Sequence, residues 1–553
     1  MKKLKYISFS LLALLLVACD QEVLTTEPAS PDTTNLPPYP CGGTSGSASF
    51  TKFVAIGNSF VAGVQGGALF TDGQNNSLPL IINNQLACAG GTQTFVQPDI
   101  KASLGWNLFV TQPFLTDNTK PILGKLLLQY GINIDCKTQQ PSPRPTAQAY
   151  APGNLEALPN PAANPNFIWG NGSTKATLNN FGVPAIVLGQ ALIPQTGAWA
   201  GAGSDPRFSP FYGRLAVPGT GTSTIIGDAA AAQGTFFMFW LGLDDFFLHA
   251  AFGADPTKAP LTSNGAFAGQ YNAAIGALLG SNPNLKGVVG NFPNIFAMPH
   301  FTSVTYNPVR LDAVLAGALN TGFAGYNSVI DALIANKAMF GISDAVATEL
   351  GTRKVAFVAS CENKVVLTDE TLTDIGPYLD AMQGAGLLPA ADRAKLVPYE
   401  QIRQSTINDV LPLSTGSALG TAGTFGIWGL SEPLTDQYVI IPSEKDAINA
   451  ARTSFNASIA AAVSGSGDRL ALADIDAAFT AFVNAKGAIY DNVFITPNIN
   501  PPTGIYSEDG VHPNSRGYAF LANVFITAIN TKFGATVPLV NLSRYSATGL
   551  PIP

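Results

Sequence analysis

The sequence predicts an α/β protein in which helices cover both faces of a mostly parallel sheet. Two observations predict this fold class. Short apolar segments typical of strands alternate along the chain with segments of helical periodicity. The segment GTFFMFWLGLDDFF (residues 234–247) contains a continuous apolar run, and such a run is typical of a strand that is buried on both faces.

The first part of the predicted sheet domain covers residues 49–300. Its opening strand is FVAI at 53–56, and further strands are predicted at the start of ATLNNFGVPAIVL (176–188) and in LKGVVGNFP (285–293). Residues 98–175 are rich in Pro, Asn and Gly and are expected to be irregular.

Residues 301–434 are predicted to be an insertion or lid that packs on the sheet domain. Within it, the segment RLDAVLAGALNTGFAGYNSVIDALIANKAMF predicts a helix, and RKVAFVAS (353–360) predicts a strand. Residues 435–553 are then expected to complete the sheet domain.

The C-terminal part has the clearest helical signals. Ser443 is the predicted N-cap of a helix, with Asp446 in the capping-box position. Apolar residues then recur at spacings of three and four and form one face: Ile448, Ala451, Phe455, Ile459 and Val463. A strand is predicted in RLALADI (469–475), and a last helix is predicted to end at Gly534.

The N-terminus has the pattern of a targeting segment. Lys2, Lys3 and Lys5 precede a short apolar run that ends in Leu-Val-Ala-Cys19, which resembles a bacterial lipobox. We expect residues 1–18 to be a lipoprotein signal peptide and Cys19 to carry acyl chains that anchor the protein to a membrane. The alternative is a signal peptide without lipidation. The polar, Pro-rich residues 19–48 are expected to form a flexible tether.

Composition limits the classes of partner. The chain has 553 residues, of which 46% are hydrophobic and 12% charged, and its net charge is −7. It therefore lacks the basic character of a nucleic-acid-binding protein. The cysteines other than Cys19 fit no zinc pattern and suit up to two disulfides in an exported protein, with three pairings open: Cys41, Cys88, Cys136 and Cys361.

Two distant segments carry residues suited to nucleophilic catalysis. FVAIGNSFVAG places Ser59 directly after the opening strand, and SEDGVHPNSRGYA places Asp509 three residues before His512. A serine nucleophile needs a base, and the base needs an acceptor that fixes its tautomer. Ser59 alone also fits a helix N-cap. The other histidines are expected to have structural roles, His249 in helix packing and His300 in a loop.

These two segments resemble the first and last blocks of the SGNH, or GDSL-type, hydrolase superfamily. GVHPNSRGYAFLANVFITAIN is especially similar to the endings of lipid-anchored members from Bacteroidetes-type bacteria. The resemblance implies a flavodoxin-like α/β/α sandwich with long loops and a large insertion. It assigns Ser59 as nucleophile, His512 as base and Asp509 as orienting acid, and it favours a lipid-anchored place in the outer membrane of a Gram-negative bacterium.

The resemblance also implies an oxyanion hole made by the backbone N–H groups of Ser59 and of residue 185 and by the side chain of residue 244. The family has glycine and asparagine where this chain has Ala185 and Asp244. The alanine is harmless unless the backbone needs a positive φ. An ionised Asp244 would have no proton to donate. A protonated Asp244, or an inward-turned Asn58, would restore a donor.

The resemblance implies a serine esterase or acylhydrolase that cleaves acyl lipids or acylated carbohydrates without a metal or cofactor. The altered residues 185 and 244 leave an alternative open, a catalytically impaired lipoprotein that binds or supports an outer-membrane protein partner. An acyltransferase that uses the same triad is a further alternative. The expected partners are an ester substrate and, through Cys19, a membrane.

Overall fold

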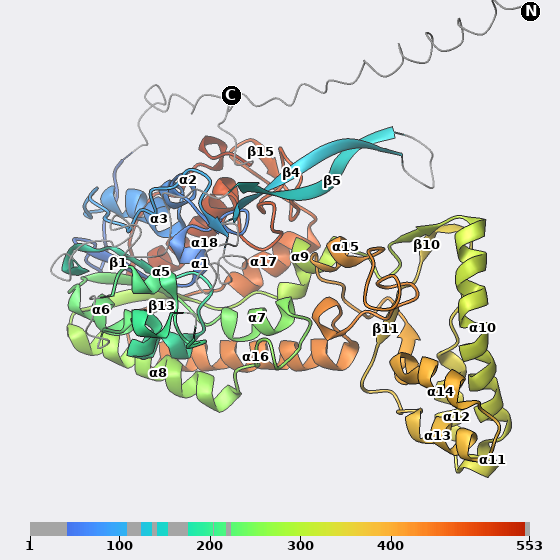
Figure 1. Cartoon of the computed structure of the whole chain (residues 1–553). Helices are drawn as coiled ribbons and strands as arrows, with labels where there is room; N and C mark the ends of the chain where they lie inside the picture. Colours follow the sequence, from blue (N-terminus) through green and yellow to red (C-terminus); the bar gives the residue numbers. More distant parts are fainter. Residues whose placement is uncertain are drawn as a thin grey trace, which may run out of the picture.

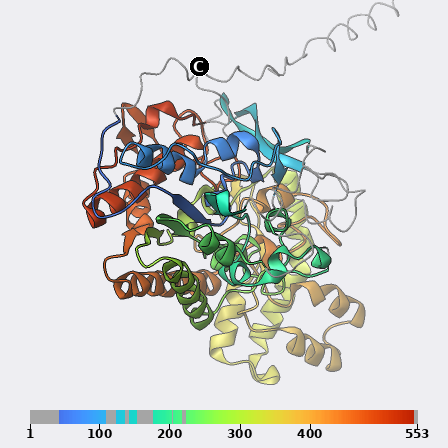
Figure 2. The ribbon, with the colours of Figure 1, turned by 90° about the vertical axis from the view of Figure 1, so that its left-hand side faces the viewer.

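The computed structural model describes residues 41–107, 123–134, 141–152, 175–202, 204–216 and 223–547. The predicted signal peptide (1–18), Cys19, Cys136 and most of the predicted tether lie outside the described residues. The chain forms a sheet domain and a smaller, mainly helical region at residues 309–434, which we call the helical lobe (Figure 1). In Figure 2 the sheet domain lies in front of the lobe.

A five-stranded parallel sheet forms the centre of the sheet domain, in the order β13-β8-β7-β1-β6. The strands are β1 (Phe53–Gly57), β6 (Asn180–Gly182), β7 (Phe236–Trp240), β8 (Lys286–Gly290) and β13 (Leu470–Ala473). Counted along the chain within this sheet, the order is 2-1-3-4-5, which is that of flavodoxin-like doubly wound folds. The predicted α/β class is confirmed.

The helices lie on both faces of this sheet. Helices α3 (Leu78–Ala87) and α18 (Ser515–Phe533) pack together on one face, whereas α8 (Asn264–Ser281) and α16 (Pro442–Gly465) pack together on the other (Figures 1 and 2). Helix α6 (Ile225–Ala231) joins the second pair. The layers are therefore those of a three-layer sandwich.

Strand β7 shows why its apolar run is continuous. The ring of Phe239 packs against Tyr271 of α8, with centroids 5.4 Å apart, and the next residue, Trp240, packs against Phe525 of α18 at 5.8 Å. Successive side chains of a strand point to opposite faces, so both faces of β7 are buried, as predicted.

Helix α16 has the predicted apolar face but not the predicted start. Ile448, Phe455 and Ile459 on that face are buried, but Ser443 is not the N-cap. The helix begins at Pro442, after Ile441, and the Glu444 carboxylate accepts the backbone N–H of Ile441 at 2.9 Å. Proline suits the first helical position because its missing N–H has no partner there.

Part of the region predicted to be irregular is a regular ribbon. Strands β4 (Leu123–Ile134) and β5 (Pro141–Pro152) pair antiparallel and project from the sheet domain (Figure 1). The prediction was wrong for these residues because their prolines argue against a central strand. An isolated two-stranded ribbon has only edge strands, and edge strands tolerate proline.

The helical lobe has a hydrophobic core of its own, separate from that of the sheet domain. Its helices α10 (Ala313–Ala335), α12 (Asp344–Thr352), α13 (Gly376–Gly384) and α14 (Ala390–Leu396) surround that core. Its strands pair two by two, β9 (Val309–Leu311) with β10 (Ser360–Asn363), and β11 (Val366–Thr368) with β12 (Ile402–Gln404).

The strand predicted at 353–360 was wrong. Only its last residue, Ser360, belongs to a strand, β10, whereas the backbone between residues 355 and 357 pairs with side chains, mainly of α10. Asn327 exchanges two hydrogen bonds with the backbone of Val355 at 2.9 Å, and Asn320 exchanges two with Phe357 at 2.8 Å. Val355 and Phe357 are buried, so the apolar residues that suggested a strand serve the lobe core.

One disulfide, Cys41–Cys88, ties the start of the described chain to the end of α3. Cys361 is also disulfide-bonded. In the part of the chain that the structure describes, no helix combines the length and the hydropathy needed to cross a bilayer.

Candidate active site

The carboxyl ends of three adjacent strands bring the predicted site together. Gly57 at the end of β1 lies opposite Gly182 of β6 on one side and Trp240 of β7 on the other. Ser59, Ala185 and Asp244 follow these strand ends within a few residues. Ligands of doubly wound sheets bind at this edge.

The glycine before Ser59 is required by a close approach of backbones. A Cβ on Gly57 would lie 2.6 Å from the carbonyl oxygen of Trp240 and 2.3 Å from Cγ2 of Val61. The next residue, Asn58, is the N-cap of the short helix α1 (Ser59–Ala62), and its Oδ1 accepts the backbone N–H of Phe60 at 3.2 Å. The N-cap is thus Asn58, which leaves the Ser59 hydroxyl free for another role.

Ser59, His512 and Asp509 form a continuous hydrogen-bonded chain. Nε2 of His512 lies 2.8 Å from Oγ of Ser59, although the two residues are 453 positions apart in the sequence. Nδ1 of His512 lies 2.6 Å from Oδ2 of Asp509. All three residues are buried, and the ring of Phe60 packs beside His512 with centroids 5.0 Å apart. In this geometry, a proton leaving Ser59 can pass to an imidazole that a carboxylate orients.

The backbone holds the Asp509 carboxylate in place. Its Oδ1 accepts the N–H groups of Val511 and His512, each at 2.9 Å, and its Oδ2 accepts the N–H of Gly67 at 2.6 Å. Burial acts to raise the pKa of Asp509, but the neighbouring His512 and these donors outweigh it and lower the pKa below its ordinary value. Asp509 is therefore ionised at neutral pH and suited to fix the imidazole.

Ala185 adopts a backbone conformation that favours glycine. Its φ is +52°, in the left-handed region that costs an L-residue roughly 1–2 kcal/mol. Within the described residues, neither its backbone N–H nor that of Ser59 donates to a protein acceptor. Both N–H groups are thus available to a ligand.

Asp244 and Asn58 form a buried pair beside these groups. Nδ2 of Asn58 donates to Oδ2 of Asp244 at 3.2 Å, and each side chain is at most 4% exposed. Burial raises the pKa of Asp244 to about 7, although His512 and Asn58 act in the opposite direction. Burial also raises the pKa of the next residue, Asp245, to about 6. At neutral pH, Asp244 is therefore protonated in a substantial fraction of molecules.

A second histidine, His300, lies beside the triad, where the sequence predicted only a loop residue. It belongs to α9 (Pro299–Thr302), and its Nδ1 lies 3.2 Å from the backbone oxygen of Asp509. Its Nε2 is buried and has no partner among the described residues, and burial lowers the pKa of the imidazole. No spacing in the sequence links His300 to Asp509, because the two are 209 residues apart.

No group of three or more His, Cys, Asp or Glu side chains in the described ranges is placed to hold a metal ion. The fold and the site together define an α/β protein with a hydrogen-bonded Ser-His-Asp chain at the carboxyl edge of its parallel sheet. In comparisons with known proteins, no family model, no curated protein and no solved structure matches this chain.

Proposed function

We propose that this protein is a serine esterase that cleaves carboxylic esters. The observation that carries the proposal is the position of the His512 ring between Oγ of Ser59 and Oδ2 of Asp509. A serine next to an imidazole whose other nitrogen meets a buried carboxylate is the arrangement of an activated nucleophile.

In the proposed mechanism, Oγ of Ser59 attacks the ester carbonyl while Nε2 of His512 takes its proton. The tetrahedral intermediate collapses, His512 returns the proton to the leaving alcohol, and the acyl group stays on Ser59. A water molecule, deprotonated by His512, then releases the acid and regenerates the serine. Asp509 orients the ring and stabilises its charged form throughout.

The oxyanion of each intermediate would be held by the N–H groups of Ser59 and Ala185, which have no acceptor within the described protein. Asp244 supplies a further donor in its protonated form. Its Oδ2 accepts from Asn58, so the proton of the acid can reside on the other oxygen. Such a donor contributes about 3–4 kcal/mol to transition-state stability in comparable sites.

The sequence resemblance to SGNH, or GDSL-type, hydrolases supports the same class and suggests acyl lipids or acylated carbohydrates as substrates. The lipobox-like N-terminus supports a lipid anchor on Cys19 in the cell envelope, with the outer membrane favoured. We expect Cys19→Ala to abolish metabolic labelling with a fatty acid; labelling that persists in this variant would exclude the anchor at Cys19.

The direct test is hydrolysis of short- and medium-chain p-nitrophenyl esters by the purified protein and by Ser59→Ala. We expect the variant to lose at least about a thousandfold in kcat/KM and to keep its melting temperature, because only the nucleophile is removed. Ser263→Ala is the matched control. It removes the N-cap hydroxyl of α8 and should lower stability by about 1 kcal/mol without changing activity.

A second candidate function is non-catalytic. It is favoured by Asp244, because an oxyanion hole needs a donor at this position and an ionised carboxylate has no proton to donate. On this alternative the protein is catalytically impaired and serves as a binding or scaffold partner in the envelope. Absence of ester turnover in the wild type as well as in Ser59→Ala, with both proteins folded, would contradict the esterase and support this alternative.

A further inference from the structure

His300 contacts the turn that carries Asp509, and the proposed mechanism gives it no role. Nδ1 of His300 lies 3.2 Å from the backbone oxygen of Asp509. The backbone N–H of His300 also donates to the backbone oxygen of the next residue, Gly510, at 2.9 Å. The side chain and the backbone of one residue in α9 therefore bind two successive carbonyl groups, both in the turn that leads from Asp509 to His512.

The glycine at position 510 allows α9 to lie close to this turn. Its φ is +70°, and a Cβ there would lie 2.7 Å from the backbone nitrogen of His300, so a larger residue would separate the two segments. Aromatic rings pack against the imidazole of His300. Its ring centroid lies 6.2 Å from that of Phe247 in α7 (Asp244–Ala251) and 4.9 Å from that of Phe301. The ring is therefore held where it meets Asp509.

The acceptor determines which nitrogen of His300 carries the proton. A backbone carbonyl oxygen can only accept a hydrogen bond, so Nδ1 must be the donor. Burial lowers the pKa of the imidazole, which favours the neutral form with one ring proton. Nε2 is then an acceptor without a partner among the described residues. Within that part of the chain, the bond to Asp509 is thus the one hydrogen bond that this ring makes.

Asp509 is held from two sides. Its carboxylate accepts the backbone N–H of Gly67 at 2.6 Å, and its backbone oxygen accepts Nδ1–H of His300, the one donor to this oxygen within the described residues. Other bonds close the turn on itself, since the N–H and the hydroxyl of Ser507 both donate to the backbone oxygen of His512 at 2.8 Å. Without the donor of His300, the backbone of Asp509 could rotate and move its carboxylate relative to the catalytic imidazole.

We infer that His300 is a positioning residue of the proposed esterase. By donating Nδ1–H to the backbone oxygen of Asp509, it holds the carboxylate in line with the imidazole of His512. This inference rests on the proposed function, and it adds a residue that bonds neither Ser59 nor His512. Small displacements of catalytic groups lower reaction rates strongly, so loss of this donor should lower kcat and leave KM unchanged.

The test compares two amide variants that place their N–H groups differently. In His300→Asn the amide nitrogen is attached to Cγ, as Nδ1 is, and can still donate to the backbone oxygen of Asp509. In His300→Gln the amide is one carbon further from the backbone, near the place of Nε2, and this bond is lost. With p-nitrophenyl esters, we expect kcat to fall roughly 10- to 100-fold in His300→Gln, with KM unchanged, and to stay within about threefold of the wild type in His300→Asn.

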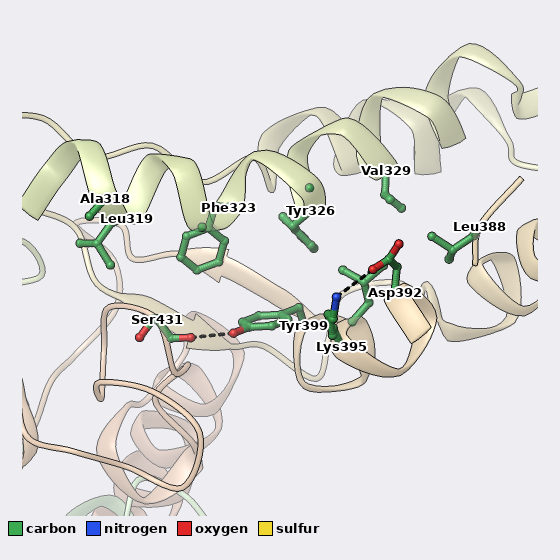
Figure 3. Close-up of a pocket in the computed structure, with 13 residues that line it drawn as sticks. Ala318, Leu319, Phe323, Tyr326, Val329, Leu388, Asp392, Lys395, Tyr399 and Ser431 are labelled. Atoms are coloured by element: carbon green, nitrogen blue, oxygen red, sulfur yellow. Dashed lines mark hydrogen bonds and ion pairs between the residues drawn. The ribbon is translucent and has the colours of Figure 1, made fainter. Parts of the chain in front are cut away.

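Two control variants lose the same kind of bond elsewhere. In His249→Gln the lost bond joins Nδ1 to the backbone oxygen of Ala259, 2.7 Å away in the sheet domain. In Tyr399→Phe it joins the hydroxyl to the backbone oxygen of Ser431, also at 2.7 Å, in the helical lobe (Figure 3). Both variants should lower stability without changing kcat. A fall in kcat in either control as large as that in His300→Gln would overturn the inference.

A second readout needs no turnover. The far-downfield proton NMR signal of the bond between Nδ1 of His512 and Asp509 should be present in the wild type and in His300→Asn, and shifted or lost in His300→Gln. An unchanged signal and kcat in folded His300→Gln would overturn the inference and leave the esterase intact. So would a signal lost and a kcat lowered at least tenfold in folded His300→Asn. If the wild type had no Ser59-dependent turnover, the proposed function would fail, and the NMR signal alone would decide whether His300 positions Asp509.

Discussion

The sheet domain and the helical lobe are stabilised in different ways. In the sheet domain, aromatic rings from separate helices meet directly, as where Phe267 of α8 stacks on Phe455 of α16 with centroids 3.9 Å apart. In the lobe, buried charges join segments that are distant in the sequence. Arg403 contacts Asp369 at 2.6 Å and Asp409 at 2.7 Å, and Glu432 accepts three backbone N–H groups.

Backbone conformation separates the two regions as well. Within the described residues, non-glycine residues with positive φ occur in the sheet domain and not in the lobe: Lys101, Ala185, Gln233, Ala254, Lys486, Asp491 and Asn492. An apolar core with large stacked rings can support strained loops at its edge. We therefore expect substitutions at the candidate site of the sheet domain to affect catalysis, and substitutions at the polar contacts of the lobe to affect its folding.

The largest expected effect concerns catalysis at the site of the sheet domain. Asp509→Asn should lower kcat for p-nitrophenyl esters by about 10⁴-fold, or about 5 kcal/mol, because the amide no longer fixes the imidazole tautomer. The melting temperature should fall, because the amide oxygen can still accept the N–H groups of Val511 and His512 but the amide nitrogen leaves the buried N–H of Gly67 without its acceptor.

The control for this prediction is Asp474→Asn, directly after the edge strand β13 of the same sheet. Asp474 caps α17 (Ile475–Asn484) and bonds Asn291, without contact to the triad. Asparagine is also a good N-cap, so activity and stability should both persist. A loss of activity equal to that of Asp509→Asn would show that the assay reports general disturbance of the sheet edge.

The second prediction tests whether the buried charges of the lobe stabilise its fold. Arg403→Ala leaves Asp369 and Asp409 buried without their cation, and we expect it to lower the local stability of the lobe by about 3–5 kcal/mol. Hydrogen exchange should show lost protection in α10 and α12, with the strands of the sheet still protected. Ester hydrolysis should continue.

Lys354→Ala is the matched control, because it breaks an exposed pair with Asp331 in the same lobe. Exposed pairs contribute at most about 1 kcal/mol, so protection of the lobe should be nearly unchanged. If Arg403→Ala instead loosened the sheet and the lobe together, the two regions would form a single cooperative unit and the comparison would fail.

The same difference explains what could be predicted from the sequence. Strand β7 and the apolar face of α16 were predictable, because a buried strand or helix face requires apolar residues in a continuous run or at a regular spacing along the sequence. Ser59, His512 and Asp509 could be predicted to lie together because the two segments that contain them resemble the first and last blocks of the same hydrolase superfamily. The extended segment at Val355 and Phe357 could not, because its hydrogen bonds go to Asn327 and Asn320 on another element.

His300 and the pair of Asn58 with Asp244 were also beyond prediction from spacing alone. His300 reaches Asp509 through a tertiary contact of its helix α9. The sequence has Asp244 where the hydrolases that it resembles have asparagine, but only the structure places the amide of Asn58 3.2 Å from its carboxyl oxygen. Polar contacts between residues that are distant in the chain produce no periodic pattern in the sequence, and this holds for the candidate site and for the lobe.

A third prediction concerns the buried acid of the site. If protonated Asp244 donates to the oxyanion, kcat should fall as pH rises through about 7, the pKa to which burial brings this group, toward a loss of roughly 10²–10³-fold. Asp244→Asn cannot ionise and should keep its rate above this pH. Because the folded-state pKa is raised, stability should also fall as pH rises from about 4 to about 7, and less so in the variant.

Asp245→Asn controls for burial of a carboxyl group at the same place. The Asp245 carboxylate accepts the N–H of Leu188 at 2.7 Å and does not bond Asn58, so its replacement should leave the alkaline decline of kcat in place. A wild-type rate that stays constant from pH 7 to pH 9 would exclude Asp244 as a donor and leave the amide of Asn58 as the candidate.

The smallest expected effect concerns the strained backbone of Ala185 at the candidate active site. Ala185→Gly should raise the free energy of unfolding by about 1 kcal/mol, because glycine adopts positive φ without steric cost. Ala254→Gly, at φ +65° and outside the site, should give a similar gain in urea denaturation. The strand end fixes the direction of the N–H at residue 185, so kcat should stay within about twofold of the wild type in both variants. A fall in kcat confined to Ala185→Gly would show that the alanine methyl group, and not only the backbone, contributes to binding the substrate.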